Sequence, residues 1–134
     1  DPSGSFIVGG QIRGEAPRLF LVYSEGNFIE SAGETPFFQT GEIKFGKPIL
    51  DRVINKHTDL VTATKCALVS FDSTIRSNLS VGPPIDLLVY KRDSLKVGIQ
   101  QRFEDGDAYL QSIRDHWNES MRLAVAELPS PEWA

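Results

Sequence analysis

SFIVGGQ (residues 5–11) and RLFLVYS (residues 18–24) are the two stretches that decide the fold. Both are short, apolar and rich in β-branched or aromatic residues, which is typical of β-strands. Between them, Gly14-Glu15-Ala16-Pro17 interrupts the chain. Glu25-Gly26-Asn27 predicts a tight turn, because Gly and Asn tolerate positive φ, and Phe28 to Ser31 return as a partner strand. The chain is therefore expected to open with antiparallel strands.

Three later segments have the spacing of helices. Lys47 to Asn55 carries Pro48 in its first turn, where a proline removes no helical hydrogen bond. Asp59 to about Asn78 repeats apolar residues three and four positions apart. Asp107 to Leu128 has Asp105 or Asp107 as its N-cap. Its apolar residues form one stripe, which consists of Leu110, Ile113, Trp117, Met121, Ala124 and Leu128.

The remaining apolar segments are short. Phe37 to Gln39 is predicted as one more short strand. Ile85 to Tyr90 and Leu95 to Gln101 flank Lys91-Arg92-Asp93-Ser94 in a hairpin pattern, which brings the number of expected strands to six. Because the order is strands, two helices, a hairpin and a last helix, we expect an α+β fold in which helices cover antiparallel sheets.

The composition is that of a soluble globular domain or of part of one. The 134 residues are 40% hydrophobic and 24% charged, with a net charge of −4. The basic residues are scattered, whereas nucleic-acid binding needs a concentrated basic face. No apolar run approaches the ~20 residues of a membrane span. Neither nucleic acid nor a membrane is therefore expected as a partner, and a single cysteine, Cys66, fits a cytoplasmic location without disulfides.

Few groups have the spacing of a catalytic or cofactor site. Cys66 lies in an apolar helical pattern with no histidine nearby in sequence, which favours a buried small side chain over a reactive thiol. His57 and His116 are isolated and lack the spacing of metal ligands. Gly9-Gly10 lacks the third glycine of a dinucleotide fingerprint, so close backbone packing explains the pair better. No metal and no cofactor are expected.

The polar run from Asp72 to Ser80 is different, because it ends a helix directly before Gly82-Pro83-Pro84. Taken alone, it is best explained by helix capping and hydrogen bonds within a loop.

This run and further blocks of the sequence resemble a known family. In chain order the blocks are Phe6 to Gly10, Pro17 to Leu21, Gly26 to Glu30, Thr35 to Gln39, Gly46 to Arg52 and Asp72 through Leu87, so the resemblance covers nearly the whole chain. They resemble the bacterial proteasome-type proteases, the ancestral β-subunit group often called Anbu, within the N-terminal-nucleophile hydrolase superfamily. The resemblance implies a four-layer αββα sandwich with antiparallel sheets. It also implies that residues 1–134 are the C-terminal portion of a single proteasome-like domain, the second half of the subunit.

The resemblance implies a particular chemistry. The family's nucleophile is an N-terminal threonine whose own α-amine acts as the base, helped by an Asp and a Lys from the first half. An α-amine titrates near pH 7–8, so it can activate a hydroxyl that is otherwise a poor nucleophile. This sequence starts at Asp1, which has no hydroxyl or thiol, and its first strand resembles the middle of a family member. The nucleophile is therefore expected outside these residues.

Two motifs of the second half support the catalytic centre in the family. A Ser-Gly-Ser-like turn corresponds here to Thr40-Gly41-Glu42, and Arg-Asp-x-x-Ser/Thr-Gly corresponds to the segment from Arg76 to Gly82. The motif's Asp is replaced by Ser77, or by Asn78 if an inserted residue shifts the register. The supporting candidates are therefore Thr40, Gly41, Glu42, Ser77, Asn78 and Ser80.

Three functions follow for the chain. The first is the supporting half of a threonine-type peptidase subunit that hydrolyses peptide bonds in a homo-oligomer, with a peptide or protein as substrate. The second is a noncatalytic proteasome-like assembly subunit. The third, an autonomous ligand-binding domain, requires a concave pocket.

Overall fold

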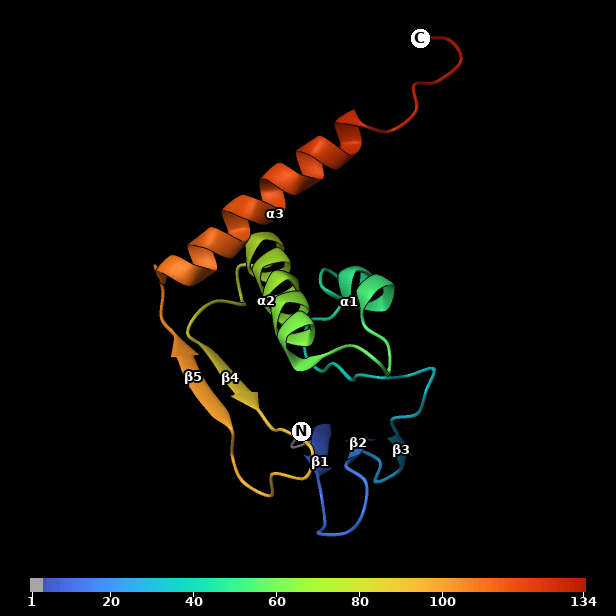
Figure 1. Cartoon of the computed structure of the whole chain (residues 1–134), viewed down its shortest axis with the longest axis vertical. Coiled ribbons are helices and arrows are strands. Elements are labelled where there is room, and N and C mark those ends of the chain that lie inside the picture. The colour runs from blue at the N-terminus through green and yellow to red at the C-terminus, as the bar shows by residue number, and fades with distance from the viewer. Residues whose placement is uncertain (1–3) are drawn as a thin grey trace.

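The computed structural model describes residues 4–134, so Asp1 lies outside the described part. Three helices and five strands follow one another in the order β1 (Phe6–Gly10), β2 (Arg18–Val22), β3 (Phe28–Glu30), α1 (Lys47–Val53), α2 (Leu60–Ser77), β4 (Ile85–Val89), β5 (Ile99–Phe103) and α3 (Ala108–Ala126). Figure 1 shows α2 between α1 and α3, with α3 extending away from the rest of the chain toward the C-terminus.

Both sheets are antiparallel, which confirms the expected α+β class. In the first sheet, β2 lies between β1 and β3, and the row Phe6–Val22–Phe28 runs across all three strands. In the second sheet, β4 pairs with β5 from Ile85 opposite Phe103 to Val89 opposite Ile99. This arrangement is consistent with part of an αββα sandwich.

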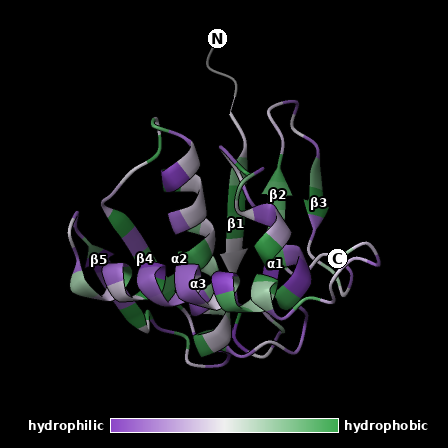
Figure 2. Cartoon of the chain, turned by 90° about the horizontal axis from the view of Figure 1, so that it is seen from above, coloured by the Kyte–Doolittle hydropathy of each residue, from purple (hydrophilic) through white to green (hydrophobic). Residues whose placement is uncertain are grey.

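The core lies where α2 meets the second sheet. Leu68, Ile85 and Phe103 form a buried cluster, and partly buried residues of α2, β4 and α3 pack against it. In Figure 2, seen from above, β2 and β3 are coloured mainly as hydrophobic, whereas α3 presents mostly hydrophilic residues.

The helix boundaries follow the predicted caps. Asp59 caps α2 by accepting a hydrogen bond from the Thr62 backbone N–H at 2.7 Å. Asp107, rather than Asp105, caps α3 through the backbone N–H groups of Tyr109 and Leu110. These capping bonds satisfy donors that the first turn of a helix leaves free.

Only the first half of the stripe on α3 is packed. Leu110, Ile113 and Trp117 are partly buried, whereas Met121 and Leu128 are exposed. The reason is that α3 contacts α2 but continues past it (Figure 1). Within residues 4–134, the C-terminal part of the stripe is therefore left uncovered.

Two expected strands differ from the structure. Phe37–Gln39 forms no strand; it lies partly buried and lines a cleft beside α1. The last strand is Ile99–Phe103 rather than Leu95–Gln101. The cause is a longer loop, in which the Leu95 backbone N–H donates to the Tyr90 hydroxyl at 3.3 Å instead of to a partner strand.

Candidate functional site

The turn at Thr40-Gly41-Glu42 is one side of the candidate site. Gly41 has φ +80°, a left-handed conformation that glycine adopts without strain. On one side of it, the hydroxyls of Thr40 and Ser5 lie 3.1 Å apart, which ties the turn to the residue before β1. On the other side, Glu42 Oε1 accepts the backbone N–H of Lys44 at 3.2 Å.

The C-terminal end of α2 is the other side of the site. Asn78 is the C-cap, and its backbone N–H donates to Thr74 O at 2.9 Å. Its side-chain Nδ2 donates to Glu42 Oε2 at 3.2 Å, across 36 residues of sequence. Its Oδ1 accepts the Ser80 backbone N–H at 2.9 Å and the Ser80 hydroxyl at 2.7 Å. The two predicted motifs are therefore in direct contact.

Not every predicted residue takes part in this network. Glu42, Asn78 and Ser80 are joined by hydrogen bonds, and Thr40 precedes Glu42 by two residues. Ser77 is the exposed last residue of α2, and within residues 4–134 its side chain forms no hydrogen bond to the others. The role of all six residues as supports of a catalytic centre stays a prediction.

The electrostatics of this cluster are unusual for a helix end. The C-terminus of a helix carries a partial negative charge, so a carboxylate beside it is unfavourable. Glu42 nevertheless lies there, and no Lys or Arg of residues 4–134 forms an ion pair with it. Arg76, in the last turn of α2, donates to Asn118 at 3.0 Å instead. Hydroxyl and carboxylate oxygens around a negative helix end can hold a cation or a protonated amine.

Two contacts of the site region were not predicted from sequence. Ser5 reaches Thr40 across 35 residues. Gln11 Oε1 accepts the Tyr90 hydroxyl at 2.7 Å, and its Nε2 donates to Asp93 at 2.7 Å. Gln11 thus ties the loop after β1 to the loop between β4 and β5. No motif or spacing in the sequence predicts these contacts, because the residues are far apart along the chain and meet only in the folded structure.

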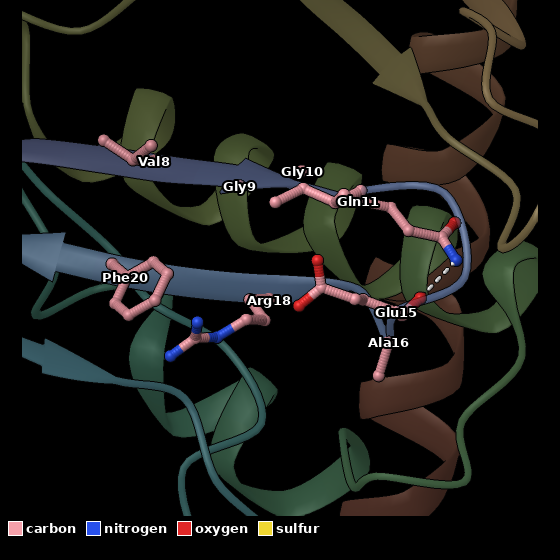
Figure 3. Close-up of a pocket in the computed structure, with 9 residues that line it drawn as sticks. Val8, Gly9, Gly10, Gln11, Glu15, Ala16, Arg18 and Phe20 are labelled. Atoms are coloured by element: carbon pink, nitrogen blue, oxygen red, sulfur yellow. Dashed lines mark hydrogen bonds between the residues drawn. The ribbon is translucent and has the colours of Figure 1, made fainter.

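A separate hollow of about 380 Å³ lies over β1 and β2. Figure 3 shows Val8 and Phe20 on neighbouring strands at one end, with the Arg18 guanidinium beside the Phe20 ring and Glu15 nearer the turn. Gly9 is explained by packing, because a Cβ there would lie 3.0 Å from Leu19 Cδ1. The residues that line the hollow include no hydroxyl or thiol beside a base, so they do not form a nucleophilic site.

Other groups with potential chemistry are accounted for by structure. Cys66 is buried, and burial raises the pKa of its thiol, which disfavours the reactive thiolate. His116 Nδ1 lies 2.9 Å from Ser112 O on its own helix. Within residues 4–134, no three His, Cys, Asp or Glu side chains are placed to share a metal ion. In the same residues, no helix is both long and apolar enough to cross a bilayer.

Comparison with known proteins places this geometry in context. No family model and no curated protein matches the chain. Solved structures do match. A protein from Hyphomicrobium is 50% identical with a TM-score of 0.92 over 98% of this chain. A protein from Pseudomonas aeruginosa is 55% identical with a TM-score of 0.92 over 98% of this chain, and its structure is described as a helical assembly. A protein from Yersinia bercovieri is 47% identical with a TM-score of 0.92 over 97% of this chain.

All three are Anbu proteins. The Yersinia protein is described as the ancestral beta-subunit. The chain covers 57%, 54% and 56% of the respective structures, so it spans little more than half of their length.

Proposed function

We propose that this chain is the supporting part of a proteasome-like, threonine-type peptidase subunit of the N-terminal-nucleophile class, and that residues 1–134 form the C-terminal portion of its single domain. The nucleophile lies in the part of the subunit that these residues do not include. Identity of 47–55% to Anbu proteins, over little more than half of their length, supports this assignment. The proposed protein is cytoplasmic, assembles with copies of itself, as the helical assembly from Pseudomonas aeruginosa suggests, and acts on peptides or proteins.

The contact between the two motifs is the observation that carries the proposal. Asn78 bonds to Glu42 on one side and to Ser80 on the other, at distances of 2.7–3.2 Å. In the proposed reaction, the α-amine of the terminal threonine takes the proton of the threonine hydroxyl as the oxygen attacks the peptide carbonyl. The proton then passes to the leaving amine. The cluster from Thr40 to Ser80 supplies acceptors that hold the amine in place.

The test is peptide hydrolysis by the full-length subunit. A group that itself transfers the proton contributes about a hundredfold or more, so a supporting hydrogen bond should contribute less, roughly tenfold to a hundredfold. We expect Asn78→Ala to lower kcat/KM for a short peptide reporter by that factor, with unchanged assembly. Asn27→Ala is the matched control, because Asn27 is exposed in the turn between β2 and β3 and its side chain forms no hydrogen bond to another residue of 4–134, and it should hydrolyse the reporter like the wild type. Hydrolysis by Asn78→Ala at the wild-type rate would refute the supporting role.

A noncatalytic assembly subunit is the second candidate. It is favoured by the residue where the motif has an aspartate, because Ser77, or Asn78 in the shifted register, carries no charge. This function predicts normal assembly of the full-length subunit and no hydrolysis of any reporter peptide, at any pH.

A further inference from the structure

Glu42 brings the only carboxylate into the group formed by Thr40, Gly41, Glu42, Ser77, Asn78 and Ser80. It comes from a different segment than Ser77 and Asn78, the two residues that can stand where the motif has its aspartate. The hydrogen bond between Glu42 Oε2 and Asn78 Nδ2, at 3.2 Å, nevertheless connects this charge to the second of them.

The direction of each hydrogen bond in the network is fixed by chemistry. A carboxylate only accepts, so Asn78 must direct its Nδ2–H toward Glu42. The other end of the amide, Oδ1, also only accepts, so the Ser80 hydroxyl donates its proton to Oδ1 at 2.7 Å. Ser80 Oγ has then used its single donor. Its lone pairs remain available to an N–H donor outside the network.

Helix capping alone does not explain why the carboxylate of Glu42 lies at the C-terminal end of α2. The C-terminal end of an 18-residue helix is stabilised by cations and destabilised by anions. Arg76 bonds to Asn118 at 3.0 Å and Lys44 Nζ lies 5.0 Å from the centre of the Phe45 ring, and neither forms an ion pair with Glu42. This partly buried carboxylate accepts hydrogen bonds from Lys44 N and Asn78 Nδ2, pairs with no cation among residues 4–134, and lies beside the negative end of the helix. Its charge is therefore available to a cation from outside these residues.

We infer that Glu42 takes the place of the absent aspartate, as a positioning residue that acts through Asn78. It fixes the Asn78 amide so that Ser80 Oγ faces an amine as acceptor, and it supplies the negative charge that holds this amine when it is protonated. The inference rests on the proposed function, in which the amine is the α-amine of the terminal threonine.

The first experiment needs no activity. The urea midpoints of the full-length subunit are compared for Glu42→Gln, Asn78→Ala and the double variant. If Glu42 acts through Asn78, the shift of the double variant is smaller than the sum of the single shifts, because neighbouring groups in one network are not additive. Glu34→Gln combined with Asn78→Ala is the matched control, since Glu34 is exposed and outside the network, and its shifts should add. Additive shifts for Glu42 and Asn78 would overturn the inference.

The second experiment follows the pH dependence of kcat/KM in the full-length subunit. A negative charge favours the protonated amine, so its removal lowers the pKa of the amine. In Glu42→Gln the acid limb should move to lower pH by roughly half a unit. Glu42→Asp keeps the charge and Glu34→Gln leaves the site untouched, so both should keep the wild-type limb. An unmoved limb in Glu42→Gln overturns the inference even in an active enzyme. If no variant and no wild type hydrolyses peptide, the proposed function fails, and the midpoints still decide whether Glu42 acts through Asn78.

Discussion

The two sheets of this chain differ in how completely their side chains are buried. On β4 and β5, Ile85 and Phe103 are 6% and 2% exposed, because Leu68 of α2 packs on them. On the first sheet, Phe6 and Phe28 share one face with Val22 and are 66% and 63% exposed. Both sheets have strand-like sequences. An apolar strand pattern therefore predicts the strand but not the element that covers it.

This difference predicts where stability resides. Burial of a large apolar side chain stabilises the fold by about 1.5–3 kcal/mol, whereas an exposed one contributes little. The region around α2 holds the buried residues, and the face of the first sheet that carries Phe6 and Phe28 is open in residues 4–134. An apolar face of this kind is typical of a surface that another segment or molecule covers.

The largest effect is expected from shortening a buried aromatic side chain. Phe103→Ala should lower the free energy of unfolding by about 3–5 kcal/mol, because it leaves a cavity beside Leu68. Phe28→Ala on the first sheet is the matched control and should change it by less than about 1 kcal/mol. Urea denaturation of both variants measures the contrast. Equal losses would mean that the first sheet is as well packed in solution as the second.

The next effect concerns close approach of the backbone. A Cβ on Gly46, at the start of α1, would overlap Ser70 Oγ and lie 3.0 Å from Ser70 Cβ on α2. We expect Gly46→Ala to cost about 1–3 kcal/mol, as other overpacked substitutions do. On β1, a Cβ on Gly10 would have no neighbour within 4 Å, so Gly10→Ala should leave the thermal midpoint nearly unchanged. A stable Gly46→Ala would show that α1 can move away from α2.

A smaller effect is expected from the ion pairs. Arg114 of α3 bonds to Asp72 of α2 at 2.7 Å, and the Asp72 side chain is only 11% exposed. Arg114→Met leaves this carboxylate without its partner and should cost about 1–2 kcal/mol, the lower part of the usual range, because Arg114 itself is 40% exposed. Arg18 and Glu30 on the first sheet form an exposed pair at 2.7 Å, which typically contributes little. Arg18→Met should therefore shift the urea midpoint less than Arg114→Met does, and a larger loss than for Arg114→Met would contradict the ranking.

The parts of the fold that could be predicted from sequence are local. Asp59, Asn78 and Asp107 delimit helices because capping depends on residues three or four positions apart. The position of β5 could not be predicted in this way. The loop before this strand is bonded through Asp93 to Gln11, 82 residues away, and a contact over that separation leaves no signal in the local sequence.

The candidate site shows the same limit. Resemblance to a family placed Thr40, Asn78 and Ser80 in two motifs, and the structure brings Asn78, which also bonds to Ser80, into contact with Glu42. The sequence does not show that Glu42 lies at the end of a helix, or that it pairs with no cation among the described residues. Both features depend on the contact between Glu42 and Asn78, which are 36 residues apart in sequence.

The smallest expected effect is the change of the free energy of unfolding at low pH, to which a carboxyl of α2's N-cap and a carboxyl of the first sheet both contribute. The hydrogen bond from the Thr62 backbone lowers the pKa of Asp59 below its ordinary value of 3.8. The Arg18 guanidinium lowers the pKa of Glu30 below its ordinary value of 4.5. A carboxyl whose folded pKa is lowered stabilises the fold above its ordinary value, and this stability is lost as the pH falls through the folded pKa. The free energy of unfolding should therefore decrease below about pH 4.

Asp59→Asn and Glu30→Gln separate the two contributions. Asparagine still caps a helix, so Asp59→Asn should flatten the decline below pH 4 without loss at neutral pH. Glu30→Gln should flatten it too, but this part should disappear in 1 M salt, where the Debye length is about 3 Å and charges on the surface are screened. The main cause at Asp59 is a hydrogen bond from the backbone rather than a distant charge, so its share should persist in salt. Urea denaturation from pH 2 to pH 6 at low and high salt measures both shares. If 1 M salt also removed the part of the decline that depends on Asp59, the Asp59 carboxylate would stabilise α2 through long-range charge rather than through its hydrogen bond. The acid responses of α2 and of the first sheet would then have the same salt dependence.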